Sequence, residues 1–487
     1  MANMNSALAD DELGVDGFVL VDRCFQCGVP HTAEKNAAAS SDPTTKETRN
    51  IQQITLKDVW ELSVPLYLED INTYIRKNVA DALWLVNKKI HDNPEKGYRE
   101  VIAHEALTSF FEARATSEGW VVTRSAYGLE TAWIAVYDSG REGPVVSFNV
   151  EMDALPSIGH ACGHNLIASA SVAAGLATAE IMRKHELGGK VVLFGTPAEE
   201  GGGGKIKLLD RGAYKDHEVD VSLISHPGTV RDAALVRTTA YTRFRVEYFG
   251  REAHAAAEPW KGINALDALI TAYNALSVLR QQTMPGDLIQ GHITDGGLRP
   301  NIVHAYAAGI FVARATTQER LVELRRKVDA CFEAGATASG AKLKVTQLGA
   351  YKDHIPNRVL GRSYTSYFNC LLDQEGSKEE EDSGGLPQRI PVDQDVDEFL
   401  HGASMASSDQ GDISHAMPSL MPGFEIAAGP GGAGPHNPGF AESAGTREAY
   451  NRSLRVGKAL AGTAIDILTH DGLLKEVKDE FKRRVGE

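Results

Sequence analysis

The chain has 487 residues, of which 43% are hydrophobic and 24% are charged, and its formal net charge is −15 at pH 7. This length allows about three domain-sized units with a large core, and the composition is ordinary for a globular protein. The acidic charge and the lack of a basic block argue against nucleic acid or an anionic membrane surface as a partner.

The first 50 residues are polar, which is typical of a tail or linker. They contain a Cys-x-x-Cys pair, Cys24 and Cys27, with His31 nearby. A structural zinc site usually needs two such pairs, and no second pair follows, so the pattern does not favour metal binding here. The tail lacks the apolar segment of a secretory signal, no apolar run is long enough to predict a membrane span, and five scattered cysteines do not indicate disulfides. We therefore expect a cytoplasmic protein.

Helix-like and strand-like patterns alternate over residues 51–237. An amphipathic helix is predicted from residue 63 to residue 91. A second helix, NLIASASVAAGLATAEIMRKHELGG, separates the first two of three apolar runs, and each run ends in a loop. The runs are PVVSFNVEMDALP, KVVLFGTPAEEGGGG and VDVSLISHPG. This alternation predicts the first part of an α/β domain, in which helices flank a mostly parallel sheet.

The pattern changes between residues 238 and 349. Strand-like and helix-like segments follow one another there in the order strand, helix, strand, strand, helix, strand. This order is the split β-α-β unit of a small ferredoxin-like α+β domain. The α/β pattern resumes over residues 350–487, so the small domain is predicted to be an insertion in the larger one. The charged stretch at 373–388 is expected to be a solvated loop.

Residues that can bind metal ions follow several of the predicted strands. Ligands of open parallel sheets bind at the carboxyl ends of the strands, so these residues are expected to meet. Each has an ordinary structural explanation when taken alone, such as a solvated turn for two glutamates before glycines. Four such sets at successive strand exits favour a metal site instead. In chain order, the residues are Glu151, Asp153, Cys162, His164, Glu199, Glu200, His226 and His436.

The adjacent glutamates Glu199 and Glu200 are expected to have two different roles. One carboxylate can bind a metal ion while its neighbour remains free as a base. Metal coordination lowers the pKa of water towards neutrality, and a nearby carboxylate can then take the proton. Two ions that share a ligand would activate one water together, so the pattern favours hydrolysis.

Six stretches, taken together, resemble peptidase family M20, the dinuclear metal amidohydrolases that include carboxypeptidase G, hippurate hydrolase and auxin-conjugate hydrolase. The resemblance covers about residues 60–470 and is closest to the Xaa-Arg (β-alanyl-lysine) dipeptidase-like branch. It implies that the inserted domain is a lid and dimerisation domain, and that the protein is a homodimer or a higher homo-oligomer. The stretches are IHDNPEKGYRE, EMDALPSIGHACGHNLI, TPAEEGGGG, GREAHAAAEPWKGINALDA, GGLRPNIVHA and SSDQGDISHAMPS.

The resemblance also implies a role for each residue of the metal site. Glu199 would be the general base, and Asp153 would orient a ligand from behind. His160 is not a ligand in the family and is expected to be structural. Two divalent ions, Zn²⁺ with Mn²⁺ or Co²⁺ as alternatives, would be bound by Cys162 as the bridge and by His164, Glu200, His226 and His436.

In the inserted domain, the resemblance implies that His254 reaches the active site of the partner subunit and polarises the scissile carbonyl. Asn301 and Arg314, expected on two adjacent strands, would bind the substrate carboxylate. The chain departs from many relatives at His304 and Asp412, which lie near the expected substrate region. The side chains of the substrate therefore stay open at this point.

These patterns predict a metal-dependent hydrolase that cleaves the amide or peptide bond of a small carboxylate-bearing substrate, such as a dipeptide or an N-acyl amino acid. Two alternatives stay open. The same fold and metal site could catalyse amide formation or modification in specialised metabolism, or the chain could be a non-catalytic metal-binding homologue. The presence of Glu199 beside a full ligand set favours an enzyme.

Overall fold

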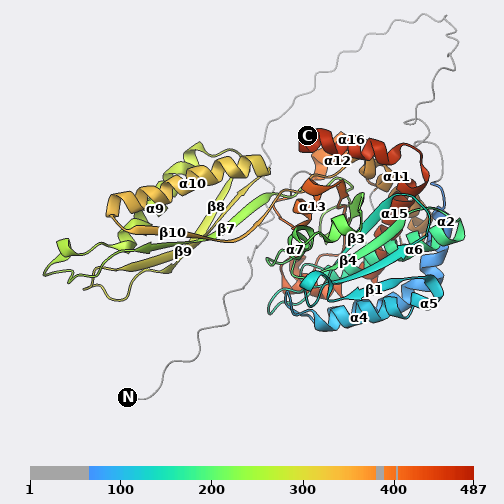
Figure 1. The fold of residues 1–487 in the computed structure, drawn as a ribbon, viewed down its shortest axis with the longest axis horizontal. Coiled ribbons are helices and arrows are strands. Elements are labelled where there is room, and N and C mark those ends of the chain that lie inside the picture. The colour runs from blue at the N-terminus through green and yellow to red at the C-terminus, as the bar shows by residue number, and fades with distance from the viewer. Residues whose placement is uncertain (1–64, 380–388, 402–403, 487) are drawn as a thin grey trace, which may run out of the picture.

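The computed structural model describes residues 65–379, 389–401 and 404–486. The predicted Cys-x-x-Cys tail, with Cys24 and Cys27, lies outside the described residues. The described chain forms a larger α/β body and a smaller α+β body that extends to one side of it (Figure 1). We refer to them, by the names that the family resemblance implies, as the catalytic domain and the lid.

The catalytic domain is built on a mixed six-stranded sheet with the order β1-β2-β4-β3-β5-β11. Strands β4, β3, β5 and β11 run parallel to one another, whereas β1 and β2 form an antiparallel edge. The strands are β1 Val121–Arg124, β2 Trp133–Asp138, β3 Val145–Glu151, β4 Lys190–Thr196, β5 Val221–Leu223 and β11 Ser419–Leu420. A short parallel pair, β6 His226–Gly228 and β12 Gly423–Glu425, lies beside it. The mostly parallel sheet predicted from the sequence is confirmed.

Helices cover both faces of this sheet because the inner strands are apolar on both faces. In β4, Val191 and Leu193 pack with one group of helices, whereas Val192 and Phe194 pack against the other. The first group is α2 Leu68–Tyr74, α3 Ala80–His91, α4 Val101–Glu112, α6 His164–Lys184, α11 Arg358–Glu379, α15 Arg447–Thr469 and α16 Leu473–Val485. The second is α7 Gly204–Asp210, α8 Ala213–Asp216 and α13 Gln410–Ala416. Helix α14 Pro438–Ala444 also belongs to the first group, and the remaining α-helices described in this domain are α5 Ala115–Glu118 and α12 Gln394–His401.

Helix α6 is the central helix of the catalytic domain. It packs against β3, β4 and α15, and nearly all of its side chains are buried. It is also the one described helix that is long and apolar enough to cross a membrane by length and composition, but 94% of its most apolar window is buried inside the protein. Its apolar composition is therefore explained by its place in the core.

The parallel strands end at one edge of the sheet. Glu151 at the end of β3 pairs in register with Thr196 at the end of β4, and β5 lies next to β3 in the same direction. The segments that leave these three strands therefore begin side by side. They carry the predicted residues Asp153, Glu199 and His226.

The lid is a four-stranded antiparallel sheet of order β10-β7-β9-β8 with two helices on one face. Its core contains the stacked rings of Phe244 and Phe311, which Phe332 meets edge to face, and it is separate from the cores of the catalytic domain. This topology confirms the predicted ferredoxin-like α+β unit. The elements are β7 Ala240–Phe249, α9 Ala265–Leu279, β8 Leu288–Asp295, β9 Tyr306–Ala315, α10 Gln318–Ser339 and β10 Lys342–Tyr351.

Three local predictions differ from the structure. The helix predicted from residue 63 to residue 91 is interrupted by a π-helical turn at Ile75–Val79. The strand expected from Asn301 begins only at Tyr306. The loop expected at residues 373–388 is wrong in its first part, because α11 continues through Glu379. Gln, Glu and Lys favour helix nearly as well as alanine, so a charged composition alone does not end a helix.

Gly163 links the fold to the predicted site, because it lies between Cys162 and His164 at the start of α6. Its φ of +79° belongs to the left-handed region, and a Cβ there would come 2.6 Å from Pro227 Cγ. We predict that Gly163→Ala lowers the affinity for divalent metal about 10-fold or more, because the added methyl displaces the neighbour of His226. Isothermal titration calorimetry with Zn²⁺ measures the change.

The matched control for this prediction is Gly140→Ala in an exposed turn. Gly140 has a φ of +70°, but a Cβ there meets nothing within 4 Å. Both variants carry a left-handed alanine, which costs about 1–2 kcal/mol, so both should lose thermal stability. Unchanged metal affinity in Gly163→Ala would separate this turn from the metal site.

Candidate metal centre

The predicted ligands meet at the carboxyl edge of the sheet in two groups that share one cysteine. The first group is Cys162, His164 and His226, and the second is Cys162, Glu200 and His436. Within each group the ligand atoms lie within 4.8 Å of one another. The Cys162 Sγ lies 3.3 Å from His226 Nε2, and Glu200 Oε1 lies 3.4 Å from His436 Nε2. The structure therefore brings together all five residues that the sequence analysis named as ligands.

Asp153 lies directly behind these groups and is fully buried. One of its carboxylate oxygens lies 3.2 Å from His164 Nδ1, so Nε2 of that ring faces the ligand groups. The same carboxylate accepts hydrogen bonds from the backbone N–H groups of Glu199, at 3.1 Å, and Glu200, at 3.0 Å. A carboxylate that orients a metal-binding histidine in this way is common in metal sites.

The turn that carries Glu199 and Glu200 is also held by Glu100, the residue just before helix α4. Ala198, which precedes the two glutamates, has a left-handed φ of +55°, and its N–H donates to Glu100 Oε1 at 2.7 Å. Thr131 Oγ1 donates to the other Glu100 oxygen at 2.7 Å. Burial raises the pKa of Glu100 to about 7. The hydrogen bonds to Ala198 and to the two glutamate amides together stabilise a conformation that a non-glycine residue rarely adopts.

The electrostatics of the site reflect more buried negative charge than the protein itself balances. Burial opposes ionisation of the Cys162 thiol, yet His226 and His164 hold its pKa well below the usual range. Burial and the negative charge of Glu151 raise the pKa of Glu199 well above its usual range. Burial and Cys162 raise the pKa of Glu200 to about 7. Such shifts are typical of carboxylates that share a buried site with other anions.

The same residues fit a divalent metal. His164 Nε2, Glu151 Oε2 and Glu200 Oε1 are buried, and their contacts of 3.3 Å or more with other residues of the site do not have hydrogen-bond geometry. Buried polar atoms are rarely left without a partner. A thiolate, imidazoles and carboxylates are the donors that Zn²⁺ and similar ions prefer. A divalent cation would satisfy these atoms and balance their charge.

Three residues of the site were not assigned roles by the sequence analysis. Glu151 lies with one oxygen, Oε2, 3.3 Å from His164 Nε2, and it forms a third possible ligand group with His164 and Glu199. Lys205, wholly buried, donates from Nζ to Glu151 Oε1 at 2.6 Å and pairs with Asp409. The buried lysine could not be recognised in the sequence, because the residues that pair with it are 54 and 204 positions away.

His160 is buried and does not belong to any of the three ligand groups found among the described residues. Its ring stacks near His91, with 6.3 Å between centroids.

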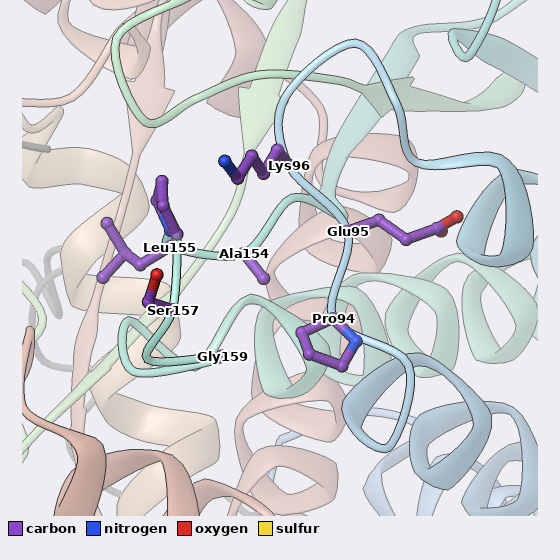
Figure 2. Close-up of a pocket in the computed structure, with 8 residues that line it drawn as sticks. Pro94, Glu95, Lys96, Ala154, Leu155, Ser157 and Gly159 are labelled. Carbon is purple, nitrogen blue, oxygen red and sulfur yellow. The ribbon is translucent and has the colours of Figure 1, made fainter. Parts of the chain in front are cut away.

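The loop that carries His160 borders an open cavity of about 240 Å³. Figure 2 shows the two walls of this cavity, which are residues 94–96 and residues 154–159. They are joined by a hydrogen bond from Ala154 N–H to Glu95 C=O at 2.7 Å. The cavity therefore adjoins the segment between Asp153 and Cys162.

The predicted lid residues lie at opposite ends of the lid. His254 and Asn301 meet beyond the end of β7, where Ala255 N–H donates to Asn301 C=O at 3.1 Å. Arg314 pairs in register with Tyr241, at the end of the sheet that joins the catalytic domain. A ten-residue strand such as β7 spans roughly 33 Å. Within one chain, Asn301 and Arg314 therefore do not meet, because Asn301 lies in the β8–β9 connection instead of on a strand beside Arg314.

His254 and Arg314 also differ in their surroundings. His254 is exposed, and its Nδ1 accepts hydrogen bonds from the N–H groups of Ala256 and Ala257 at 3.2 and 3.1 Å. A ring that accepts at Nδ1 carries its proton on Nε2, which is then a donor. Arg314 is buried, and its Nη1 donates to Ser407 Oγ at 2.8 Å.

Comparisons with known proteins agree with this geometry. Peptidase family M20/M25/M40 matches residues 148–291, which contain four of the five predicted ligands. The chain is 37% identical over 416 residues to the Xaa-Arg dipeptidase of Mus musculus, covering 84% of this chain and 90% of that protein. It is 37% identical over 421 residues to the Xaa-Arg dipeptidase of Homo sapiens, covering again 84% and 90%.

Solved structures show the same fold. A dinuclear metal-binding M20 peptidase from Bacillus subtilis has a TM-score of 0.51 at 17% identity and covers 80% of this chain and 98% of its own. The fold and the joined ligand groups define a metal-dependent hydrolase of amide bonds in small substrates. The chain belongs to the M20 family of peptidases.

Cys162 offers a direct chemical test of the site. We predict that iodoacetamide modifies Cys162 in the chelated protein, because its pKa is lowered, and that bound metal protects it by occupying the thiolate. Cys331 and Cys370, which lie outside the ligand groups, should react equally in both states. Mass spectrometry of tryptic peptides measures the labelling. Equal labelling of Cys162 with and without metal would contradict a ligand role.

Proposed function

We propose that the protein is a dinuclear zinc dipeptidase whose general base is Glu199. The observation that carries this proposal is the sharing of Cys162 by two ligand groups, with the Glu199 carboxylate beside them and outside both. His164 Nε2 lies 3.8 Å from Glu199 Oε2. A carboxylate beside two ligand groups, but not needed as a ligand in either, is placed to accept a proton from water bound near them.

The donor set supports zinc, with Mn²⁺ or Co²⁺ as alternatives. Cys162, His164 and His226 would hold one ion, and Cys162, Glu200 and His436 the other. A thiolate and three imidazoles are softer than the all-oxygen sets that Mg²⁺ and Ca²⁺ prefer. Divalent ions bound there supply Lewis acidity, which polarises a carbonyl group and makes water more acidic.

Side chains of the protein then transfer the proton and stabilise the negative charge that develops on the carbonyl oxygen. Glu199 accepts the proton of the attacking water and delivers it to the leaving amine, as a general base and then a general acid. Its raised pKa favours proton uptake, because it makes the Glu199 carboxylate a stronger base towards water. His254, with its proton on Nε2, donates to the oxygen of the scissile carbonyl as negative charge develops there.

The separation of the lid residues supports a homodimer. His254 follows the end of β7 and Asn301 precedes β9, and these ends of the two strands point away from the catalytic domain of their own chain (Figure 1). An isologous dimer would place this end at the partner's metal centre and would do so twice. The substrate carboxylate would then be bound by Arg314 of one subunit and Asn301 of the other.

The proposed substrates are dipeptides with a free carboxylate and a basic C-terminal residue. The mouse relative is named for cleavage before arginine, and its similarity covers 84% of this chain. The net charge of −15 also favours the approach of a cationic substrate. N-acyl amino acids form the second class to be assayed, because other relatives hydrolyse conjugates of this type by name.

A substrate screen with a base variant tests the proposal. We predict that the zinc-loaded protein hydrolyses Xaa-Arg and Xaa-Lys dipeptides and that Glu199→Gln lowers kcat about 10²-fold or more. The substitution removes the base but leaves both ligand groups, so metal content by plasma mass spectrometry should not change. Glu130→Gln, at an exposed turn, is the matched control and should keep full activity. Near-normal turnover in metal-replete Glu199→Gln would overturn the mechanism.

Mixing inactive subunits tests the dimer. Glu199→Ala and His254→Ala should each be inactive alone, because each lacks one group that every site needs. After exchange of equal amounts, half of the dimers are mixed, and one of their two sites has both groups intact. Activity should therefore recover to roughly a quarter of the wild-type value. No recovery after exchange, proven by native mass spectrometry, would place His254 outside the partner's site.

A further inference from the structure

Tyr351, the last residue of the lid strand β10, reaches into the turn that carries the proposed base. Its side chain is 5% exposed. Its hydroxyl donates to the Glu199 C=O at 2.8 Å and accepts from the Gly203 N–H at 3.1 Å. One hydroxyl therefore closes the loop between Glu199 and the start of α7 at Gly204.

The other contacts that hold this turn come from the catalytic domain. Glu100 accepts from Ala198 N–H, and Asp153 accepts from Glu199 N–H and Glu200 N–H. These two carboxylates bind the backbone before and at the glutamates. The Tyr98 hydroxyl donates to Gly202 C=O at 2.7 Å. Tyr351 binds the backbone at and after Glu199, through the Glu199 carbonyl and the N–H of Gly203. The turn is therefore held by contacts from both the catalytic domain and the lid.

On its other side, Tyr351 contacts the first strand of the lid. It pairs in register with Tyr241 of β7, and the two rings meet edge to face with 5.0 Å between centroids. The Arg314 guanidinium lies 4.9 Å from the centre of the Tyr241 ring. Contacts therefore run without a break from Arg314, through Tyr241 and Tyr351, to the backbone of Glu199.

We propose that Tyr351 is a positioning residue that ties the placement of Glu199 to the placement of the lid. Strand β7 begins and strand β10 ends at this tyrosine pair, where the lid joins the catalytic domain. A shift of the lid relative to the catalytic domain therefore moves the Tyr351 hydroxyl. The Glu199 carbonyl then shifts with it, because breaking a buried hydrogen bond leaves its partners unsatisfied at a cost in free energy. This inference rests on the proposed role of Glu199 as the base.

The proposal predicts an effect on turnover more than on substrate binding. Tyr351→Phe keeps the ring and its contact with Tyr241 but removes the hydroxyl from Glu199 C=O and Gly203 N–H. Small displacements of a reacting group can cost up to about 100-fold in rate. We expect kcat to fall about tenfold, with KM and zinc content unchanged, because none of the ligand groups contains Tyr351.

Tyr248→Phe is the matched control. Tyr248 is also a buried lid tyrosine, and its hydroxyl donates to Phe332 C=O at 2.7 Å inside the lid core. This variant loses one buried hydrogen bond of similar length without touching the Glu199 turn. It should lower the melting temperature by as much as Tyr351→Phe, but its kcat should equal that of the wild type.

Hydrogen exchange gives a second readout that does not depend on activity. In the zinc-loaded protein, amides of residues 197–206 should exchange faster in Tyr351→Phe than in the wild type, and at the wild-type rate in Tyr248→Phe. Faster exchange together with a selective loss of kcat supports the proposal. Unchanged exchange, or equal loss of kcat in both variants, overturns it. Absence of activity in the wild type would instead refute the proposed function, and the exchange result would still decide whether Tyr351 holds the turn.

Discussion

The carboxylate of Asp153 is the contact on which the arrangement of the metal centre depends. It is buried at the exit of β3 and binds three groups from two other segments, namely the His164 ring and the N–H groups of Glu199 and Glu200. Its negative charge is stabilised by these donors, which hold the pKa of Asp153 below its usual range in spite of burial. If this carboxylate moved, the proposed ligands His164 and Glu200 and the proposed base Glu199 would move together.

Charge balance is the second constraint on this site. Cys162, Glu151, Glu199 and Asp409 are buried together, with the partly buried Glu200 beside them, and burying charges without partners is costly. Lys205 offsets part of this charge through its pairs with Glu151 and Asp409. The remaining negative charge faces the two ligand groups, where divalent cations would balance it. The same imbalance that makes the metal-free site costly gives it affinity for metal.

The lid adds a constraint of distance. Its sheet holds Arg314 and Tyr351 against the catalytic domain and carries His254 and Asn301 one strand length away. A rigid antiparallel sheet cannot bring its two ends to one substrate. The proposed second subunit would resolve this separation, and the tyrosine pair at the near end connects the lid to the Glu199 turn.

The sequence by itself determined the α/β class, the ferredoxin-like insertion and the residue types that gather at the sheet edge. These features depend on local periodicity and on the rule that parallel strands end at one edge, so they can be inferred without coordinates. Only the tertiary structure decided which distant groups meet. The pairing of Lys205 with Glu151 and Asp409, the hydroxyl of Tyr351 on the Glu199 carbonyl, and the separation of Asn301 from Arg314 all depend on contacts between segments far apart in the chain. The reason is that such contacts follow from the packing of whole elements and from the register of the lid strands, and a local pattern of residues records neither.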